Sequence, residues 1–305
     1  MVPSQPEPAP PVWLKFSPAI FVFLWSTGFV GAKFGLPYAE PFSLLALRFF
    51  LSGSLLMLLA LAVRETLPTR HQIGHSMVAG MLMHGAYLTA AFWAISIGMP
   101  AGIVGLIVGL QPLLTAQFGR LIGERITRRN WIGLLIGLIG VTMVIGPKLE
   151  APGDGISVAG VLAGFAGVVA ISAGSIYQKR FGGGTAVFSG TACQFLGGFL
   201  VAFVGACLFE NFRIDFTIEF LLTLAWMVLV LSIGAVSLLT LLIKHGSVAK
   251  IAGMFYLVPG VTALMTWILF GEDLTPFQIL GMVICMGGVA LASRGMPSRD
   301  SPAER

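Results

Sequence analysis

The segment Gly123-Glu124-Arg125-Ile126-Thr127 recurs 148 residues later as Gly271-Glu272-Asp273-Leu274-Thr275. In each copy a Gly stands ten residues after the first Gly, and a Gly-Val pair begins seven residues further on. Upstream of each copy stands a Leu-x-Pro triplet, which ends at Pro112 in the first copy and at Pro259 in the second. The chain therefore contains two copies of one structural unit.

The composition around these copies is that of a membrane protein. Of 305 residues, 18 are Lys or Arg and 13 are Asp or Glu, so 10% are charged, against about 25% in soluble domains. Hydrophobic residues make up 56%. A soluble globule of this size has too little interior to bury so much apolar surface. Soluble enzymes, disordered proteins and disulfide-rich secreted domains are therefore excluded.

Apolar runs predict the number of membrane crossings. A spanning helix needs about 20 mostly apolar residues. Since the offset of the repeat corresponds to five helices, an odd number, the two copies must point in opposite directions. We expect an all-α membrane protein with ten transmembrane helices as two inverted five-helix repeats, at residues 17–147 and 157–294, between a disordered cytoplasmic tail (1–16) and a cytoplasmic tail (295–305). The ten expected spans are 17–36, 42–63, 74–97, 100–121, 130–146, 157–177, 185–209, 220–243, 248–270 and 276–293.

The distribution of Lys and Arg predicts the orientation. With a cytoplasmic N-terminus, fourteen basic residues lie inside and only Lys148 and Arg213 lie in outside loops, as the positive-inside rule requires. The repeated motif changes charge in the same sense: Arg125 in the first copy corresponds to Asp273 in the second. We therefore predict a multi-pass protein of the cell inner membrane with both termini cytoplasmic.

The chain resembles the drug/metabolite transporter superfamily, specifically its ten-helix EamA-type exporters. The resemblance covers nearly the whole chain and is carried by Trp25-Ser26-Thr27-Gly28-Phe29, by Leu47-Arg48-Phe49 and by the two Pro…Gly-Glu…Gly…Gly-Val blocks. It is closest to bacterial inner-membrane exporters of aromatic and other amino acids and related metabolites. The resemblance implies the inverted ten-helix fold and an export function. It does not name the solute.

Polar residues near the middle of the expected spans are the candidate binding groups, because inverted-repeat transporters bind substrate near the bilayer midplane. His84 and Tyr87 are three residues apart, and we expect them to share a helix face. Each candidate has a competing interpretation as a packing residue or as a hydrogen-bonding link between helices. The predicted substrate-binding residues are Trp25, Ser26, Thr27, His84, Tyr87, Gln111, Ser175, Ser237 and Tyr256.

Two prolines and two charges inside the spans complete the set. Pro112 and Pro259 occupy equivalent mid-helix places and are predicted hinges, because proline removes one backbone donor and kinks a helix. Lys33 and Arg48 are the only charges within the expected spans. Either would suit an anionic group, but we favour a structural link to helix-end carbonyls or to Glu40.

These features predict a secondary transporter rather than an enzyme. All thirteen Asp and Glu lie outside the expected spans or at their ends, which leaves an intramembrane protease without its carboxylates. No phosphate-binding loop occurs, and no cofactor or metal site is expected; His71 and His75 have no third ligand nearby. We expect a small-molecule substrate, the lipid bilayer and no nucleic acid as partners; the oligomeric state stays open and a monomer is compatible with the sequence.

Two alternatives remain within transport. A sugar-phosphate or other metabolite antiporter of the same superfamily would need paired Lys or Arg at the midplane, and a channel-like facilitator would conduct without saturation. The uncharged midplane residues suit a zwitterion. We therefore predict export of amino acids, including apolar and aromatic ones, by alternating access.

Overall fold

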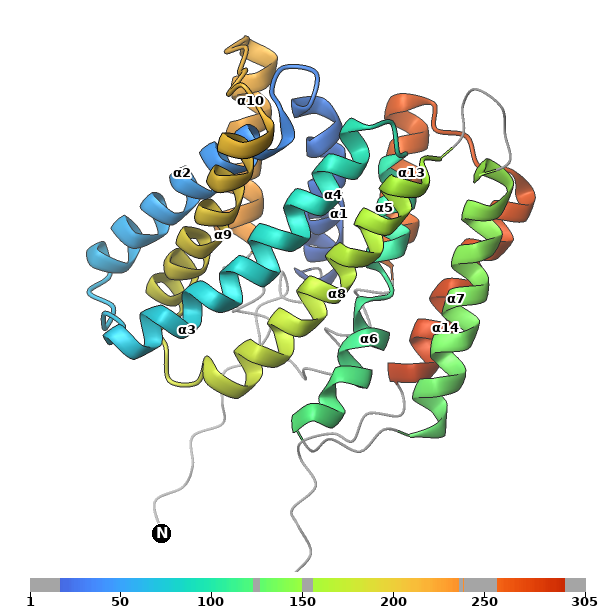
Figure 1. Ribbon diagram of the computed structural model, residues 1–305, viewed down its shortest axis with the longest axis horizontal. Coiled ribbons are helices and arrows are strands. Elements are labelled where there is room, and N and C mark those ends of the chain that lie inside the picture. Colours follow the sequence, from blue (N-terminus) through green and yellow to red (C-terminus); the bar gives the residue numbers. More distant parts are fainter. Residues whose placement is uncertain (1–16, 123–126, 150–155, 236–237, 239–256, 294–305) are drawn as a thin grey trace, which may run out of the picture.

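The computed structural model describes residues 17–122, 127–149, 156–235, 238 and 257–293. In this part of the chain the protein is helical, and its extended pairing is limited to an isolated bridge between Ala39 and Ile214. Figure 1 shows the helices packed as one bundle. Their bounds are α1 Ser17–Gly35, α2 Pro41–Ala62, α3 Arg70–Gly80, η2 Met81–Ala86, α4 Tyr87–Ser96, α5 Ala101–Val108, α6 Gln111–Phe118, η3 Gly119–Ile122, α7 Arg128–Leu149, α8 Val158–Phe181, α9 Val187–Phe209, α10 Ile218–Ala225, η4 Trp226–Ala235, α13 Val258–Phe270 and α14 Pro276–Ser293.

The helices have the length and composition of membrane spans. Within the described residues, seven are apolar and long enough to cross a bilayer, and three shorter apolar helices lie at Ala19–Gly35, Val258–Phe270 and Pro276–Leu291. Large apolar side chains such as Leu135, Leu222 and Ile268 are exposed on the outside of the bundle, where a bilayer would cover them. The predicted all-α, multi-pass membrane class is confirmed. The first part of the expected span 248–270 lies outside the described residues.

Helices α7 and α14 lie side by side at one edge of the bundle (Figure 1). Their contact uses the glycines of the repeated motif. A side chain at Gly140 would overlap the backbone of Gly281, and one at Gly288 would overlap the backbone of Gly133. Because Gly133 corresponds to Gly281 and Gly140 to Gly288, the two contacts exchange under a twofold rotation, which is the relation expected between inverted copies.

A second exchanged contact joins α2 and α9. The carboxylate of Glu210, which follows α9, accepts hydrogen bonds of 2.8 Å from the backbone N–H groups of residues 42–43 at the start of α2. The carboxylate of Glu65, which follows α2, accepts bonds of 3.1 and 2.7 Å from the N–H groups of residues 188–189 at the start of α9. Each carboxylate thus caps the partner helix, where the helix dipole favours negative charge.

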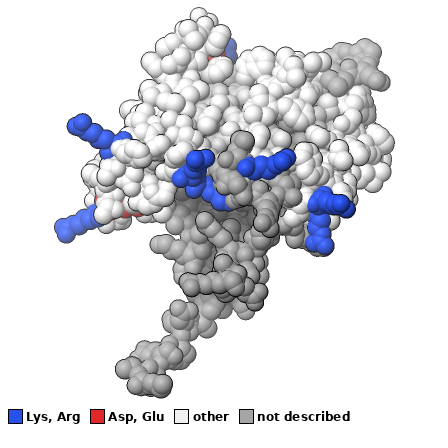
Figure 2. All heavy atoms as spheres, turned by 60° about the horizontal axis from the view of Figure 1, so that its bottom comes forward, with Lys and Arg blue, Asp and Glu red and all other residues white. Residues whose placement is uncertain are grey.

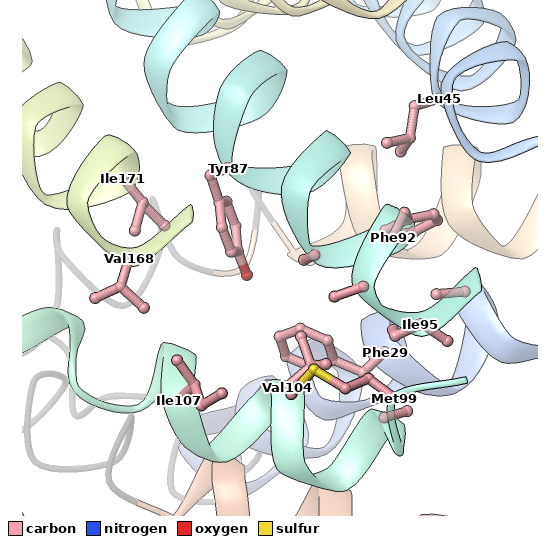
Figure 3. Packing of buried hydrophobic residues seen from close by; sticks show 14 of the residues in the cluster. Phe29, Leu45, Tyr87, Phe92, Ile95, Met99, Val104, Ile107, Val168 and Ile171 are labelled. Atoms are coloured by element: carbon pink, nitrogen blue, oxygen red, sulfur yellow. The ribbon is translucent and has the colours of Figure 1, made fainter. Parts of the chain in front are cut away.

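The core lies where α1, α4, α5 and α8 meet. Figure 3 shows the Tyr87 ring pointing between α8, which contributes Val168 and Ile171, and α5, which contributes Ile107. Phe29 of α1 lies on the far side of this space and is 4% exposed. The interior of the bundle is therefore built mostly from apolar side chains.

Basic side chains gather at one end of the bundle. Figure 2 shows Lys and Arg around the face formed by the lower end of Figure 1, with few acidic residues among them. The helix ends there carry Arg64, Arg70, Arg120, Arg128, Arg129, Lys179 and Arg180. This asymmetry agrees with the charge pattern of the sequence, although Lys148, which was expected in an outside loop, lies in the last turn of α7.

Candidate functional site

The fourth expected span is broken in the middle. Helix α5 ends at Val108, and α6 begins at Gln111 with Pro112 as its second residue. In the second repeat, α13 begins at Val258 with Pro259 as its second residue. Proline suits the first turn of a helix, where its missing N–H has no intrahelical partner to lose. Gly109 and Leu110 keep right-handed helical φ and ψ angles, so the predicted kink at Pro112 is a local break in the helical hydrogen bonding between α5 and α6.

The two proline-containing starts lie close together. A Cβ atom at Gly109, in the break between α5 and α6, would stand 2.7 Å from the Pro259 ring. A helix start carries the positive end of the helix dipole, so the starts of α6 and α13 both bring partial positive charge to this place. Such paired half-helix starts are the usual surroundings of an anionic substrate group in broken-helix transporters.

Gln111 and Ser175, both predicted site residues, are brought together at this break. The Gln111 side-chain amide donates a 3.3 Å hydrogen bond to the Ser175 hydroxyl, and the Ser172 hydroxyl donates one of 3.3 Å to the Gln111 carbonyl. Ser175 in turn donates to the Ile171 carbonyl at 2.7 Å. The partly buried Gln111 amide thus ties the start of α6 to α8 while keeping further donor and acceptor capacity.

Ser26 and Thr27 connect the two repeats. The fully buried Ser26 hydroxyl lies 2.8 Å from the Val22 carbonyl and 3.4 Å from the carbonyl of Val258, at the start of α13. The Thr27 hydroxyl accepts a 3.0 Å bond from the indole N–H of Trp226. Both hydroxyls therefore already have protein partners, which makes them links across the repeat interface.

Trp25 lies beside these two residues, partly buried, with its ring 5.4 Å from that of Phe21. Its indole packs against the small cluster formed by Phe21 and Ala235. Ser237 and Tyr256, the last two predicted binding residues, lie outside the described residues.

His84 and Tyr87 turn toward different neighbours, so the expectation of a shared face does not hold. The His84 ring stacks on Phe195 of α9 at 4.6 Å, whereas Tyr87 points between α8 and α5 (Figure 3). The cause is the π-helix Met81–Ala86, which needs more residues per turn than an α-helix and so shifts the angle between residues three apart. Such π segments are common at functional sites.

Arg48 has none of the partners that the sequence suggested. Glu40 accepts instead from the backbone N–H groups of Asn211 and Arg213, at 3.0 and 2.8 Å, and no ion pair joins it to Arg48. The Arg48 residue is 7% exposed, and its Nε has no hydrogen-bond partner in the described part of the chain. The same is true of the fully buried Ser52 hydroxyl, one turn along α2. Sequence reasoning missed Ser52, although its spacing of four from Arg48 was a usable signal.

Lys33 has a different partner from the one considered. Its ammonium group forms an ion pair with Glu272, the Glu of the second repeated motif. The Glu272 carboxylate also lies 3.3 and 3.4 Å from the N–H groups of Ala101 and Gly102 at the start of α5. Lys33 is therefore a structural link between α1, the α13–α14 turn and α5.

His71 and His75 lie at the same end of the bundle as the basic residues. Their Nε2 atoms are 3.1 Å apart, and His75 Nδ1 is 2.7 Å from the Tyr177 hydroxyl. Within the described residues no group of three His, Cys, Asp or Glu comes together as metal ligands do.

Comparison with known proteins gives one family. The model of the EamA-like transporter family matches residues 16–146 and, a second time, residues 158–294. A probable amino-acid metabolite efflux pump of Salmonella typhimurium is 27% identical over 286 residues, which cover 90% of this chain and 92% of that protein. An uncharacterised inner membrane transporter of Escherichia coli, YedA, is 24% identical over 91% of this chain and 89% of its own length.

One solved structure has the same fold. It superposes with a TM-score of 0.65 over 92% of this chain and 98% of its own, at 23% sequence identity.

Proposed function

We propose a transport function for this chain from the premise that it belongs to the EamA-like transporter family, whose model matches both of its repeats. The resemblance inferred from the repeated motifs is thereby confirmed at the level of the family. The proposed transporter has ten crossings, with the described helices and the span 248–270 as its two inverted sets of five. It alternates access to a site between the repeats.

One observation carries this proposal: two half-helices, α6 and α13, start beside each other from equivalent Leu-x-Pro triplets. A helix that is interrupted inside the membrane leaves backbone groups unpaired, and this is tolerated only where protein, water or solute supplies partners. The Gln111 amide and the starts of α6 and α13 together offer donors for a solute carboxylate. The Val108 carbonyl, which Pro112 leaves without its usual helical donor, offers an acceptor for its ammonium group.

The proposed substrate class is amino acids, including apolar and aromatic ones. The proteins of Salmonella typhimurium and Escherichia coli that bear the name probable amino-acid metabolite efflux pump, at 27% and 26% identity, support this choice. The apolar surroundings of Tyr87 suit an apolar side chain. A sugar phosphate would require several basic groups around one site, and the described interior holds the single guanidinium of Arg48.

The proposed location is the inner membrane with both termini in the cytoplasm. The basic lower face of the bundle supports this orientation through the positive-inside rule. Single cysteines at Arg70 and at Arg213, in a background without Cys193, Cys207 and Cys285, test it directly. The cysteine at position 213 should react with an impermeant thiol reagent added from outside, and the one at position 70 should not. The reverse pattern would overturn the orientation.

Counterflow in proteoliposomes tests the transport proposal. Purified protein is reconstituted and loaded with one unlabelled amino acid at a time, and the uptake of its labelled form is followed. We expect saturable counterflow for at least one apolar or aromatic amino acid. Uptake without saturation and without stimulation by internal substrate would indicate a channel-like facilitator. Counterflow of sugar phosphates alone would contradict the amino-acid assignment.

A further inference from the structure

Arg48 is the one basic side chain that the described interior holds without a carboxylate beside it. It lies seven residues into α2, which corresponds to roughly 10 Å of helix, and it is 7% exposed. The carboxylates of Glu40, Glu65, Glu210 and Glu272 all accept from backbone N–H groups at helix starts or in turns. A charge at such depth is costly unless it is paired.

One face of α2 carries two polar groups that could each form a further hydrogen bond. Arg48 Nε and the hydroxyl of Ser52 lack hydrogen-bond partners in the described part of the chain. The two residues are four apart and so lie on one face of the helix. Buried donors left without partners cost free energy, and their persistence at a shared face is typical of a site completed by a ligand.

The surroundings fit an anion of modest size. Helix α2 packs against α4, which begins at Tyr87, and the His84 ring lies 6.2 Å from the ring of Phe49, the residue after Arg48. These groups offer hydrogen-bond donors without negative charge, since a phenol and a neutral imidazole can both donate. A guanidinium binds a carboxylate in a planar, two-pronged geometry and is the side chain best suited to it.

The equivalent face of α9 carries no charged side chain. Phe42, Ser43, Ala46 and Phe49 correspond to identical residues 146 positions later in α9, and the stacked rings of Phe49 and Phe195, 5.8 Å apart, mark where the two helices cross. In this register Arg48 corresponds to Gln194 and Ser52 to Gly198. If Arg48 served only the architecture of the repeat, the inverted copy would require the same contact.

We infer that Arg48 and Ser52 form the subsite that holds the carboxylate of the transported solute. The inference rests on the proposed amino-acid transport and deepens it, because it assigns the part of the substrate that α2 recognises. The guanidinium supplies the charge, and the Ser52 hydroxyl donates a further hydrogen bond. The solute's side chain then extends toward the apolar space around Tyr87.

Substitutions of Arg48 and of Ser52 test the subsite. The amino acid that the wild type carries best is compared with its carboxamide, which keeps the side chain and the ammonium group. We expect Arg48→Gln to weaken binding of the acid about a hundredfold, as removal of one partner of a buried charge pair does, and to leave binding of the amide within about twofold. Arg48→Lys should retain the preference for the acid at reduced affinity, and Ser52→Ala should weaken the acid several-fold. Arg64→Gln removes the same charge at the exposed end of α2 and should change neither ligand.

If the role of Arg48 is purely structural, Arg48→Gln weakens binding of the acid and of the amide by the same factor. That outcome overturns the subsite. If Arg48→Gln does not yield folded protein, the same ratio of affinities for acid and amide, measured in Arg48→Lys and Ser52→Ala, tests the subsite. If the wild type carries no amino acid, the transport proposal fails on its own. Binding of 3-phenylpropionate that is weaker in Ser52→Ala and in Arg48→Lys than in the wild type would then still support a carboxylate subsite, and equal binding would refute it.

Discussion

Helices α2 and α9 occupy equivalent places in the two repeats, and they differ in what they offer to the interior. Both carry Phe-Ser as their second and third residues, both are capped by a carboxylate from the other repeat, and both present a Phe at their crossing. Yet α2 carries Arg48 and Ser52 where α9 carries Gln194 and Gly198. The third span of each repeat contains a π-helix, η2 or η4. The N-caps of these spans, Thr69 and Thr217, are 148 residues apart, and at that offset His84 corresponds to Ser232. Among the described residues the repeat thus preserves caps and crossings, whereas the charge inside α2 has no counterpart in α9.

The largest expected effect is at the close packing of α9 against α3. A side chain at Gly197 would overlap the backbone of Met77, whereas the equivalent position of α2 is Leu51. Gly197→Leu should therefore destabilise the fold by more than about 3 kcal/mol, since overpacking against backbone has no easy relief. We expect little monodisperse protein in size-exclusion chromatography. Gly74→Leu, at a glycine of α3 with open space around it, is the matched control and should behave as the wild type.

A smaller but specific effect is expected at the break in the first repeat. Gln111→Ala should raise the substrate KM about fivefold to tenfold without loss of expression, because it removes one side-chain hydrogen-bonding group worth about 1 kcal/mol. Ser175→Ala should have a weaker effect, since Gln111 keeps the bond between its carbonyl and Ser172. Counterflow at varied substrate concentration measures both. An unchanged KM for Gln111→Ala would reduce this residue to a packing role.

The paired prolines test whether the two breaks act as opposite hinges. Pro112→Ala and Pro259→Ala each allow a more continuous helix and should slow turnover several-fold, with less effect on binding. Because the repeats are inverted, one variant should favour an inward-open and the other an outward-open state. Accessibility of a cysteine placed in the interior, measured from each side, reports the bias. If both variants shift in the same direction, the symmetry is only architectural.

The smallest effect is expected from the exchanged caps. Glu65→Gln should cost about 1 kcal/mol of unfolding free energy, in the range of a lost N-cap. Burial alone raises the pKa of Glu65, but the hydrogen bonds from Ser189 and Phe188 outweigh it and hold the pKa below its ordinary value of 4.5. A carboxyl whose pKa is lowered by folding contributes stability above its unfolded pKa and loses it as the pH falls through the folded value. Melting temperatures from pH 7 to pH 4 should therefore fall less steeply in Glu65→Gln than in the wild type. Equal slopes would contradict this role.

The sequence alone was enough for the class, the family and most helix positions. Membrane insertion depends on the apolar content of each run, which is a local property, and the described helices fall where those runs are. The Gly positions of the two motifs also marked a real contact, since Gly140 and Gly281 meet, and each motif proline stands in the first turn of a described helix. Gln111 and Ser175 were each predicted as site residues, but the hydrogen bond between them was found only in the structure.

Only the tertiary structure decided which side chains face one another. Glu210 caps α2 and Lys33 pairs with Glu272 across large distances in the sequence, and such contacts depend on how the helices pack rather than on any local pattern. The π-helix before Tyr87 changed the direction of His84, because one additional residue per turn rotates all that precedes it. The unpaired state of Arg48 could not be read from the sequence either, because Glu40 was a plausible partner until its carboxylate was located at the α9–α10 turn. Depth in the membrane is set by residue number along a helix; the partner of a buried charge is set by the neighbouring helices.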